Sequence, residues 1–135
     1  GEMPTQFFSE LPNGIHVFKS VPQLEILGLC DLMITHGGIN SMLECINTAT
    51  PMLVYPLNNK WDQNGNAARI IYYQLGLAGN IKRDKLNSIE RKMKVLLSNP
   101  NYRTNLINIQ RKIKAEKGMD KGLEKVKALT GQAAW

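Results

Sequence analysis

Residues 31–48 read DLMITHGGINSMLECINT, and this stretch decides the fold. The run Asp31–Thr35 is mostly apolar and leads directly into the pair Gly37-Gly38, which favours a strand followed by a tight turn. From about Asn40 to Thr48, apolar side chains recur at helical spacing. The stretch therefore predicts a strand, a glycine turn and a helix, the unit from which parallel sheets are built.

The same alternation of short apolar runs and helical patterns continues on both sides of this stretch. Strands are predicted at Ile15–Phe18, Pro51–Pro56 and Leu77–Ile81. Helices are predicted at Gln23–Leu29, from Asp62 to about Leu75 with Gly76 as its stop, at Leu86–Leu97, and from the Asn99-Pro100 break to about Lys117. The sequence thus predicts an α/β fold, with a parallel sheet and flanking helices in residues 1–117 and a short C-terminal helix and tail in residues 118–135.

The composition is that of an ordinary globular domain. With 135 residues, of which 43% are hydrophobic, the chain can bury one core. No apolar run approaches the roughly 20 residues of a membrane-spanning helix. Cys30 and Cys45 lie in apolar stretches without the spacing of a metal site, which favours reduced, buried thiols. We therefore expect a cytoplasmic protein that holds no metal.

Charge is distributed unevenly along the chain. Residues 1–81 contain three of the 17 Lys and Arg and six of the 11 Asp and Glu, whereas residues 82–135 contain the other 14 basic and five acidic residues. A basic half can indicate a nucleic-acid or acidic-membrane surface, or only a solvated helix face. Because no stacking aromatic residues alternate with these basic residues, we expect no nucleic-acid partner, and membrane association stays open.

The glycine turn is the first candidate site. Two glycines between a strand and a helix let a phosphate approach the backbone N–H groups of the first helical turn, where the helix dipole favours an anion. His36, Asn40 and Ser41 can add donors to the phosphate oxygens. The alternative is an ordinary turn in which Asn40 or Ser41 caps the helix.

Two further groups of polar residues follow the predicted strands. Ser41 and Glu44 have the spacing of a capping box, or Glu44 faces a ligand and accepts hydrogen bonds from ribose hydroxyls. Asp62 either caps its helix or, with Gln63, supplies acceptors and donors to the hydroxyls of a sugar. The carboxyl ends of parallel strands meet at one edge of a sheet, which is where ligands of such folds bind.

Taken together, these residues resemble the C-terminal half of GT-B glycosyltransferases, which have two facing Rossmann-like domains. The resemblance is to the UDP-glucosyl/glucuronosyltransferases and the bacterial macrolide-type glycosyltransferases. It covers about residues 15–81. The matching residues are Val21-Pro22-Gln23, Thr35 to Glu44, Thr50-Pro51-Met52, Pro56, Asp62-Gln63 and Asn66-Ala67.

The resemblance implies a partial Rossmann-like, nucleotide-sugar-binding domain and a role for each matched residue. The diphosphate-binding residues would be His36, Gly37, Gly38, Asn40 and Ser41. The residues that line the base and the ribose would be Val21, Gln23 and Glu44. The residues that hold the donor sugar would be Asp62 and Gln63.

The function implied is the donor-binding part of a glycosyltransferase, which transfers a hexosyl group from a nucleoside-diphosphate sugar, in the first place a UDP-sugar, to an acceptor. The nucleotide sugar is a co-substrate, and no cofactor is implied. We expect this chain to lack the N-terminal acceptor domain, the catalytic base and two strands that precede the matched region, to be inactive alone, and to form a homodimer. The alternatives are a fragment of a nucleotide-sugar epimerase and a non-catalytic nucleotide-binding module.

Overall fold

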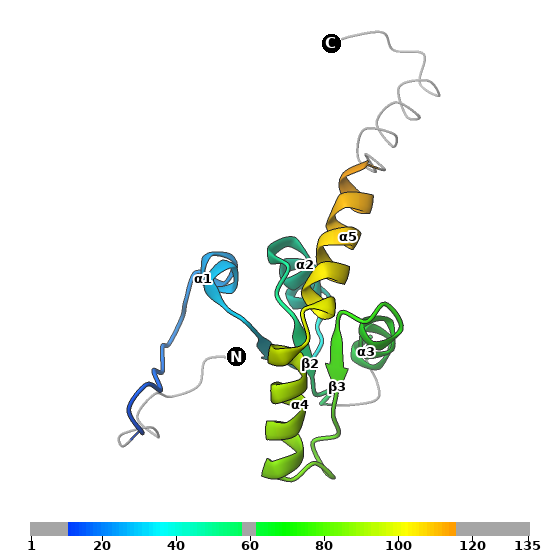
Figure 1. The fold of residues 1–135 in the computed structure, drawn as a ribbon. Helices are drawn as coiled ribbons and strands as arrows, with labels where there is room; N and C mark the ends of the chain where they lie inside the picture. Colours follow the sequence, from blue (N-terminus) through cyan, green and yellow to red (C-terminus); the bar gives the residue numbers. More distant parts are fainter. Residues whose placement is uncertain (1–10, 58–61, 116–135) are drawn as a thin grey trace, which may run out of the picture.

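The computed structural model describes residues 11–57 and 62–115. A parallel sheet lies at the centre of these residues (Figure 1), with the strand order β1-β2-β3. The register places Met33 beside Met52 and Met52 beside Gly76. The strands are β1 (Met33–Thr35), β2 (Met52–Val54) and β3 (Gly76–Ala78). The predicted α/β class with a parallel sheet is confirmed.

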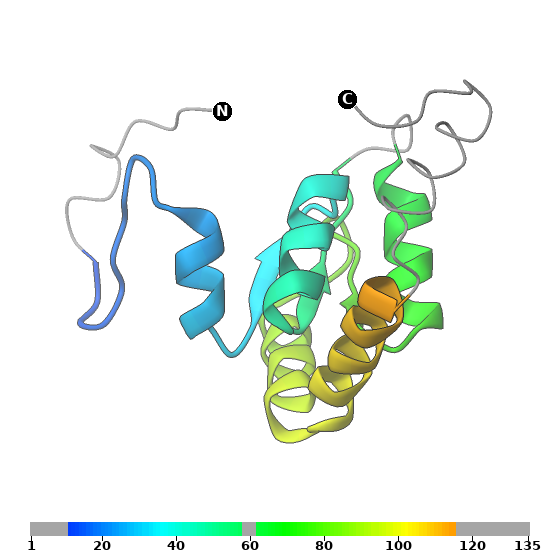
Figure 2. The ribbon, with the colours of Figure 1, turned by 90° about the horizontal axis from the view of Figure 1, so that it is seen from above.

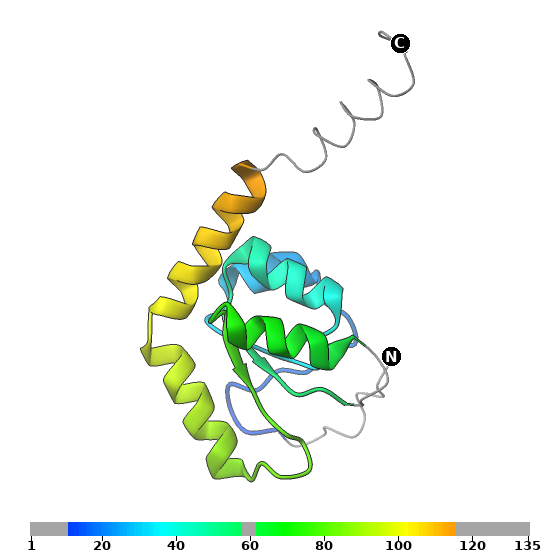
Figure 3. The same ribbon diagram turned by 90° about the vertical axis from the view of Figure 1, so that its right-hand side faces the viewer.

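The helices cover both faces of this sheet, as Figure 3 shows. The helices are α1 (Gln23–Leu29), α2 (Ile39–Thr48), α3 (Gln63–Tyr72), α4 (Leu86–Ser98) and α5 (Asn101–Ala115). Successive residues of β2 point to opposite faces, so Met52 and Val54 pack with α2 and α3, whereas Leu53 packs with Leu96 of α4. Within the described residues, α2 and α3 therefore form one outer layer and α4 the other.

Helix α1 lies beside α2 at the β1 side of the sheet, as Figure 2 shows from above. Leu27 is its buried anchor. The hydroxyl of Thr50, which is also buried, donates a 2.8 Å hydrogen bond to the Leu27 carbonyl near the end of the helix. These two contacts fix the helix that carries Gln23.

The predicted strand at Ile15–Phe18 is wrong. The segment has no regular secondary structure and pairs with none of the described strands, and Figure 1 shows it in blue, well away from the sheet. Ile15 is 53% exposed and Phe18 is 67% exposed. A β-branched, aromatic run becomes a strand only where a neighbouring strand accepts its hydrogen bonds, and this segment has no such neighbour.

The sequence predicts that Gly76 ends a helix, and this prediction is wrong. Helix α3 already ends at Tyr72, and the turn after it contains Gln74 in the left-handed region, with φ 51°. Gly76 is the first residue of β3, where a Cβ atom would collide with the backbone carbonyl of Met52. The glycine is therefore required by the close approach of β3 to β2. The third strand accordingly begins at Gly76 and ends at Ala78, earlier than the predicted Leu77–Ile81.

The described residues include both cysteines but not the predicted C-terminal helix and tail. Cys45 is fully buried and Cys30 half-buried, and both thiols are free. No described helix is long and apolar enough to cross a membrane. The predicted C-terminal helix and tail at residues 118–135 lie outside the described residues.

Candidate functional site at the carboxyl edge of the sheet

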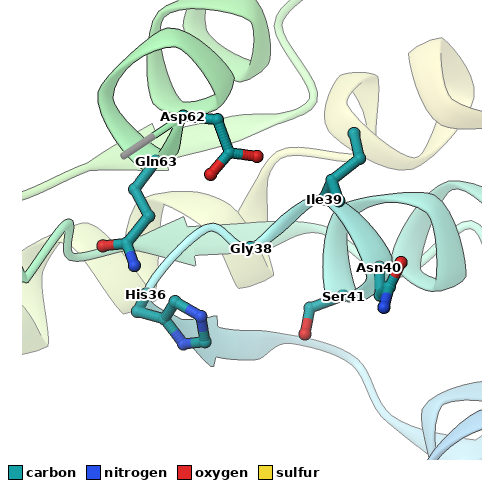
Figure 4. A pocket seen from close by; sticks show the side chains of 7 residues that line it. All are labelled: His36, Gly38, Ile39, Asn40, Ser41, Asp62 and Gln63. Atoms are coloured by element: carbon teal, nitrogen blue, oxygen red, sulfur yellow. The ribbon is translucent and has the colours of Figure 1, made fainter. Parts of the chain in front are cut away.

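The segments that follow β1 and β2 meet the starts of α2 and α3 at the carboxyl edge of the sheet. They line an open pocket of about 540 Å³. Figure 4 shows its lining, which is His36, Gly38, Ile39, Asn40, Ser41, Asp62 and Gln63. The structure thus brings the residues predicted for a diphosphate, except the buried Gly37, and those predicted for a donor sugar to one pocket.

The turn between β1 and α2 requires glycine at one of its two positions. Gly37 has φ 84°, and a Cβ atom built on it would lie 2.7 Å from Cγ1 of Val54. Both the left-handed backbone and the contact with the core exclude a side chain there. Gly38 has φ −63°, an ordinary value, and is the N-cap of α2.

No side chain caps α2. Because Gly38 is the N-cap, Asn40 and Ser41 lie inside the first turn, and the alternative in which either of them caps the helix is wrong. The first backbone N–H groups of any helix lack partners within it. The residues that carry these groups, from Ile39 to Ser41, line the pocket, and the glycine N-cap offers them no side-chain oxygen. A helix start of this kind favours an anion.

His36 lies against the start of α2. A Cβ atom on Gly38 would be 2.9 Å from the His36 Nε2 atom, so the absence of a side chain at Gly38 makes room for the imidazole. Figure 4 shows the ring turned towards Ser41, with the Gln63 amide above it. His36 is exposed, and its ring nitrogens are therefore available to a ligand in the pocket.

Glu44 does not belong to a capping box. In α2, which begins at Ile39, Ser41 is the third residue rather than the cap, and Glu44 lies a further turn along the helix. The Glu44 Oε2 atom instead accepts a 2.6 Å hydrogen bond from Nε2 of Gln23, and the same nitrogen lies 3.5 Å from Oγ of Ser41. The predicted ribose residues Gln23 and Glu44 are therefore in contact, although 21 residues separate them.

A second pocket, of about 410 Å³, adjoins the first. Its lining is Gln23, Met33, Ile34, Thr35, His36, Ser41, Tyr55 and Leu57. His36 and Ser41 line both pockets, so they stand between the Gln23 side and the Asp62–Gln63 side of the site. Val21 is 40% exposed beside the start of α1 and lines neither pocket.

Asp62 and Gln63 are held by other residues of the site. Asp62 is the N-cap residue of α3, but its side chain makes no capping hydrogen bond, and its Oδ2 atom instead accepts a 3.2 Å hydrogen bond from Nδ2 of Asn66. The Gln63 Oε1 atom accepts a 2.9 Å hydrogen bond from the backbone of Leu57. Figure 4 shows the Asp62 carboxylate directed into the pocket and the Gln63 amide near His36. Asn66, whose role sequence reasoning left undefined, thus contacts the site.

Sequence reasoning missed Tyr55, whose position directly after β2 was the available signal. Its hydroxyl donates a 2.9 Å hydrogen bond to Oδ2 of Asp84, which also pairs with Lys92. Burial and the bond to Asp84 raise the pKa of Tyr55 to about 12. The hydrogen bond from Lys92 in turn lowers the pKa of Asp84. The trio fixes the ring that lines the second pocket.

Comparison with known proteins agrees with this geometry. The family model of the erythromycin biosynthesis protein CIII-like C-terminal domain matches residues 2–126. Zeaxanthin glucosyltransferase of Pantoea ananas is 34% identical over 112 residues, which are 82% of this chain and 25% of that protein. NDP-glycosyltransferase YjiC of Bacillus subtilis is 27% identical over 125 residues, which are 93% of this chain and 31% of that protein.

A solved structure extends the comparison to the fold. The crystal structure of the glycosyltransferase of kitacinnamycin superimposes with a TM-score of 0.81 and 26% identity, over 90% of this chain and 31% of that chain. The chain thus spans about a quarter to a third of the length of these proteins. By the extent of the match, it belongs to the EryCIII-like C-terminal domain family of GT-B glycosyltransferases.

Proposed function

We propose that this chain is the donor-binding part of a glycosyltransferase and that its ligand is a nucleoside-diphosphate sugar, in the first place a UDP-sugar. The observation that carries the proposal is the start of α2. Its cap is a glycine, which supplies no side-chain oxygen to the first N–H groups, and His36 lies beside it. A diphosphate supplies the negative charge and the acceptor oxygens that this arrangement favours.

The positions of the two pockets support one direction for the proposed ligand. With the diphosphate at His36, Gly37, Gly38, Asn40 and Ser41, the sugar would extend towards Asp62 and Gln63, whose carboxylate and amide suit hydroxyl groups. The ribose would extend the other way, towards Gln23 and Glu44, with Val21 near the base. Relatives named NDP-glycosyltransferase and glucosyltransferase support this class of ligand.

The chemistry assigned to the chain is stabilisation of a leaving group. When the bond between the sugar and the diphosphate breaks, negative charge grows on the diphosphate oxygens. The preorganised N–H groups of α2 and the His36 ring would stabilise that charge in the transition state. No residue of this chain is assigned as the catalytic base, and we propose that the base and the acceptor site belong to another domain. The chain alone is then expected to bind the donor without transferring the sugar.

A second copy of the chain is the other partner that we propose. Strand β1 pairs only with β2 among the described strands, and its residue Ile34 is 51% exposed. An exposed apolar edge strand recruits other chains.

Titration calorimetry with UDP tests the proposed ligand. The wild-type chain should bind, and His36→Ala should weaken binding by about 1–3 kcal/mol, the scale of a lost charge-assisted hydrogen bond. His16→Ala is the matched control, because His16 is exposed in the segment before α1. Equal affinity in all three proteins would reject the role of His36. A wild-type chain that does not bind UDP would support the alternative, a non-catalytic module in which the glycine turn is only structural.

A further inference from the structure

Asn66 is the buried polar residue of α3 and is 1% exposed. Its Nδ2 atom donates a 2.9 Å hydrogen bond to the carbonyl of Gly37 and a 3.2 Å hydrogen bond to Oδ2 of Asp62. Its Oδ1 atom accepts a 3.1 Å hydrogen bond from Nη1 of Arg69. One side-chain amide therefore contacts the glycine turn, which is 29 residues away, and the carboxylate at the start of its own helix.

The contact with Gly37 acts on the backbone of the α2 start. In a trans peptide the C=O and N–H groups point in opposite directions. By holding the carbonyl of Gly37 on the α3 side, Asn66 directs the Gly38 N–H away from α3. Gly37 has φ 84° and no side chain, so the hydrogen bond from Asn66 is a contact that can hold the orientation of this peptide.

The contact with Arg69 determines which way the amide faces. The guanidinium can only donate, so it requires the amide oxygen on its side. The NH₂ group is then directed to the two acceptors, Gly37 and Asp62. An amide is planar, and both of its N–H groups are used. The positions of the Gly37 carbonyl and the Asp62 carboxylate are therefore fixed relative to one another.

We propose that Asn66 is a positioning residue that couples the diphosphate subsite to the donor-sugar subsite. This inference rests on the proposed function, because it assigns the Gly37–Gly38 peptide to the diphosphate and Asp62 to the sugar. Asn66 itself lines neither pocket. One amide orients both the turn and the Asp62 carboxylate. The residue that would hold the sugar is therefore correctly oriented only together with the turn that would bind the diphosphate.

Asn66→Asp is the sharpest variant, because it keeps the shape of the side chain and the acceptor for Arg69. It removes both donated hydrogen bonds and places carboxylate oxygens against the Gly37 carbonyl and the Asp62 carboxylate. We expect UDP binding by the full chain to weaken about fivefold or more, which is the scale of one buried hydrogen bond. The ratio of the affinity for UDP-glucose to the affinity for UDP should also fall. It should reach the ratio of the variant Asp62→Ala, which lacks the carboxylate that Asn66 orients. Asn108→Asp, on the exposed face of α5, is the control for the added charge and should leave both affinities unchanged.

The ratio separates positioning from simple stability. A merely structural residue would lower the melting temperature and leave the ratio of the two affinities as in the wild type, which would overturn the coupling. Where Asn66→Asp does not fold, Arg69→Ala gives the answer, since it removes only the bond that orients the amide and lies at an exposed position. It should lower the same ratio by a smaller factor, and an unchanged ratio overturns the proposal.

The double variant Asn66→Asp/Asp62→Ala completes the test. Under the coupling, Asn66→Asp changes the ratio in the wild-type background and leaves it unchanged once Asp62 is absent. Independent effects on the ratio in both backgrounds would overturn the coupling. A wild-type chain that does not bind UDP overturns the proposed function, and the coupling with it, whereas wild-type binding with an unchanged ratio in the variants overturns the coupling alone.

Discussion

Gln23 and Glu44 join α1 to α2 through a hydrogen bond of 2.6 Å between Nε2 and Oε2. The bond uses one of the two carboxylate oxygens of Glu44. It brings two side chains from separate helices close to Ser41. Because Ser41 is the third residue of α2, Glu44 cannot reach back to the cap of the helix. Glu44 lines neither pocket itself and is tied to the site through Gln23, which lines the second one.

Glu44→Gln is expected to separate stability from binding. A cap stabilises the free protein, whereas a ribose contact contributes only when ligand is present. We expect the melting temperature of the free chain to stay almost unchanged, since the surface hydrogen bond to Gln23 contributes about 1 kcal/mol or less. The upward shift caused by UDP should become smaller. A variant that melts several degrees lower and keeps the full UDP shift would contradict the ribose role.

The two glycines of the turn are expected to fail in different ways. Gly37→Ala forces a side chain into the left-handed region and against Val54, which should cost roughly 2–4 kcal/mol of the free energy of unfolding. Gly38 has an ordinary backbone, so Gly38→Ala should cost less than about 1 kcal/mol. The new methyl group meets the His36 ring, however, and should displace it and weaken UDP binding.

Chemical denaturation measures the free energy of unfolding of the two variants, and calorimetry measures their affinity for UDP. The expected result is a destabilised Gly37→Ala and a stable Gly38→Ala that binds UDP poorly. Equal stabilities would mean that the turn does not depend on the left-handed residue. Full UDP affinity in Gly38→Ala would mean that the position of His36 beside α2 does not matter for the ligand.

The parts of the fold that the sequence predicted correctly are those set by local pattern. The apolar runs at β1 and β2 and the helical spacing of α1 and α2 follow from burial on one or both faces. The errors arose where a distant residue decides. Ile15–Phe18 has the composition of a strand but no partner, and Gly76 looks like a helix stop although its cause is the Met52 carbonyl on the next strand.

The candidate site shows the same division. The glycine turn could be located because its residues are contiguous, and so could the polar pair at the start of α3. The capping box failed because the spacing of Ser41 and Glu44 is right but the helix begins earlier than they require. The contact between Tyr55 and Asp84 joins residues 29 positions apart, and only the folded chain shows that they meet.

Asp84 is expected to make stability depend on pH. Its pKa is lowered in the folded state, chiefly by the hydrogen bond from Lys92, so folding is favoured when the carboxylate is charged. This contribution is present above the ordinary pKa of aspartate, about 3.9, and is lost as the pH falls through the lower folded value. Asp84→Asn should therefore lower the melting temperature at pH 7, and the difference from wild type should shrink towards pH 2.

Glu90→Gln provides the control for that measurement. Glu90 pairs with Lys94 on the surface of α4, where both side chains are more than half exposed. Exposed pairs of this kind contribute little to stability. Its melting temperature should follow that of the wild type at both pH values. A difference for Asp84→Asn that is the same at both pH values would show that the charge of Asp84 is not the cause.

The last prediction concerns the free edge of β1. Ile34 lies on this strand and is half exposed, and within the described residues β1 has a partner on one side only. The Ile15–Phe18 segment lies away from the sheet and does not pair with this edge, so within the described residues the edge stays open. We therefore expect the chain of 15.2 kDa to associate at micromolar concentration in sedimentation equilibrium. Ile34→Lys should shift the equilibrium to monomer, because a charge at an edge opposes strand pairing. Ile113→Lys, on the half-exposed face of α5, should not. A wild-type monomer at every concentration, with cooperative unfolding, would show that three strands are stable with that edge in water.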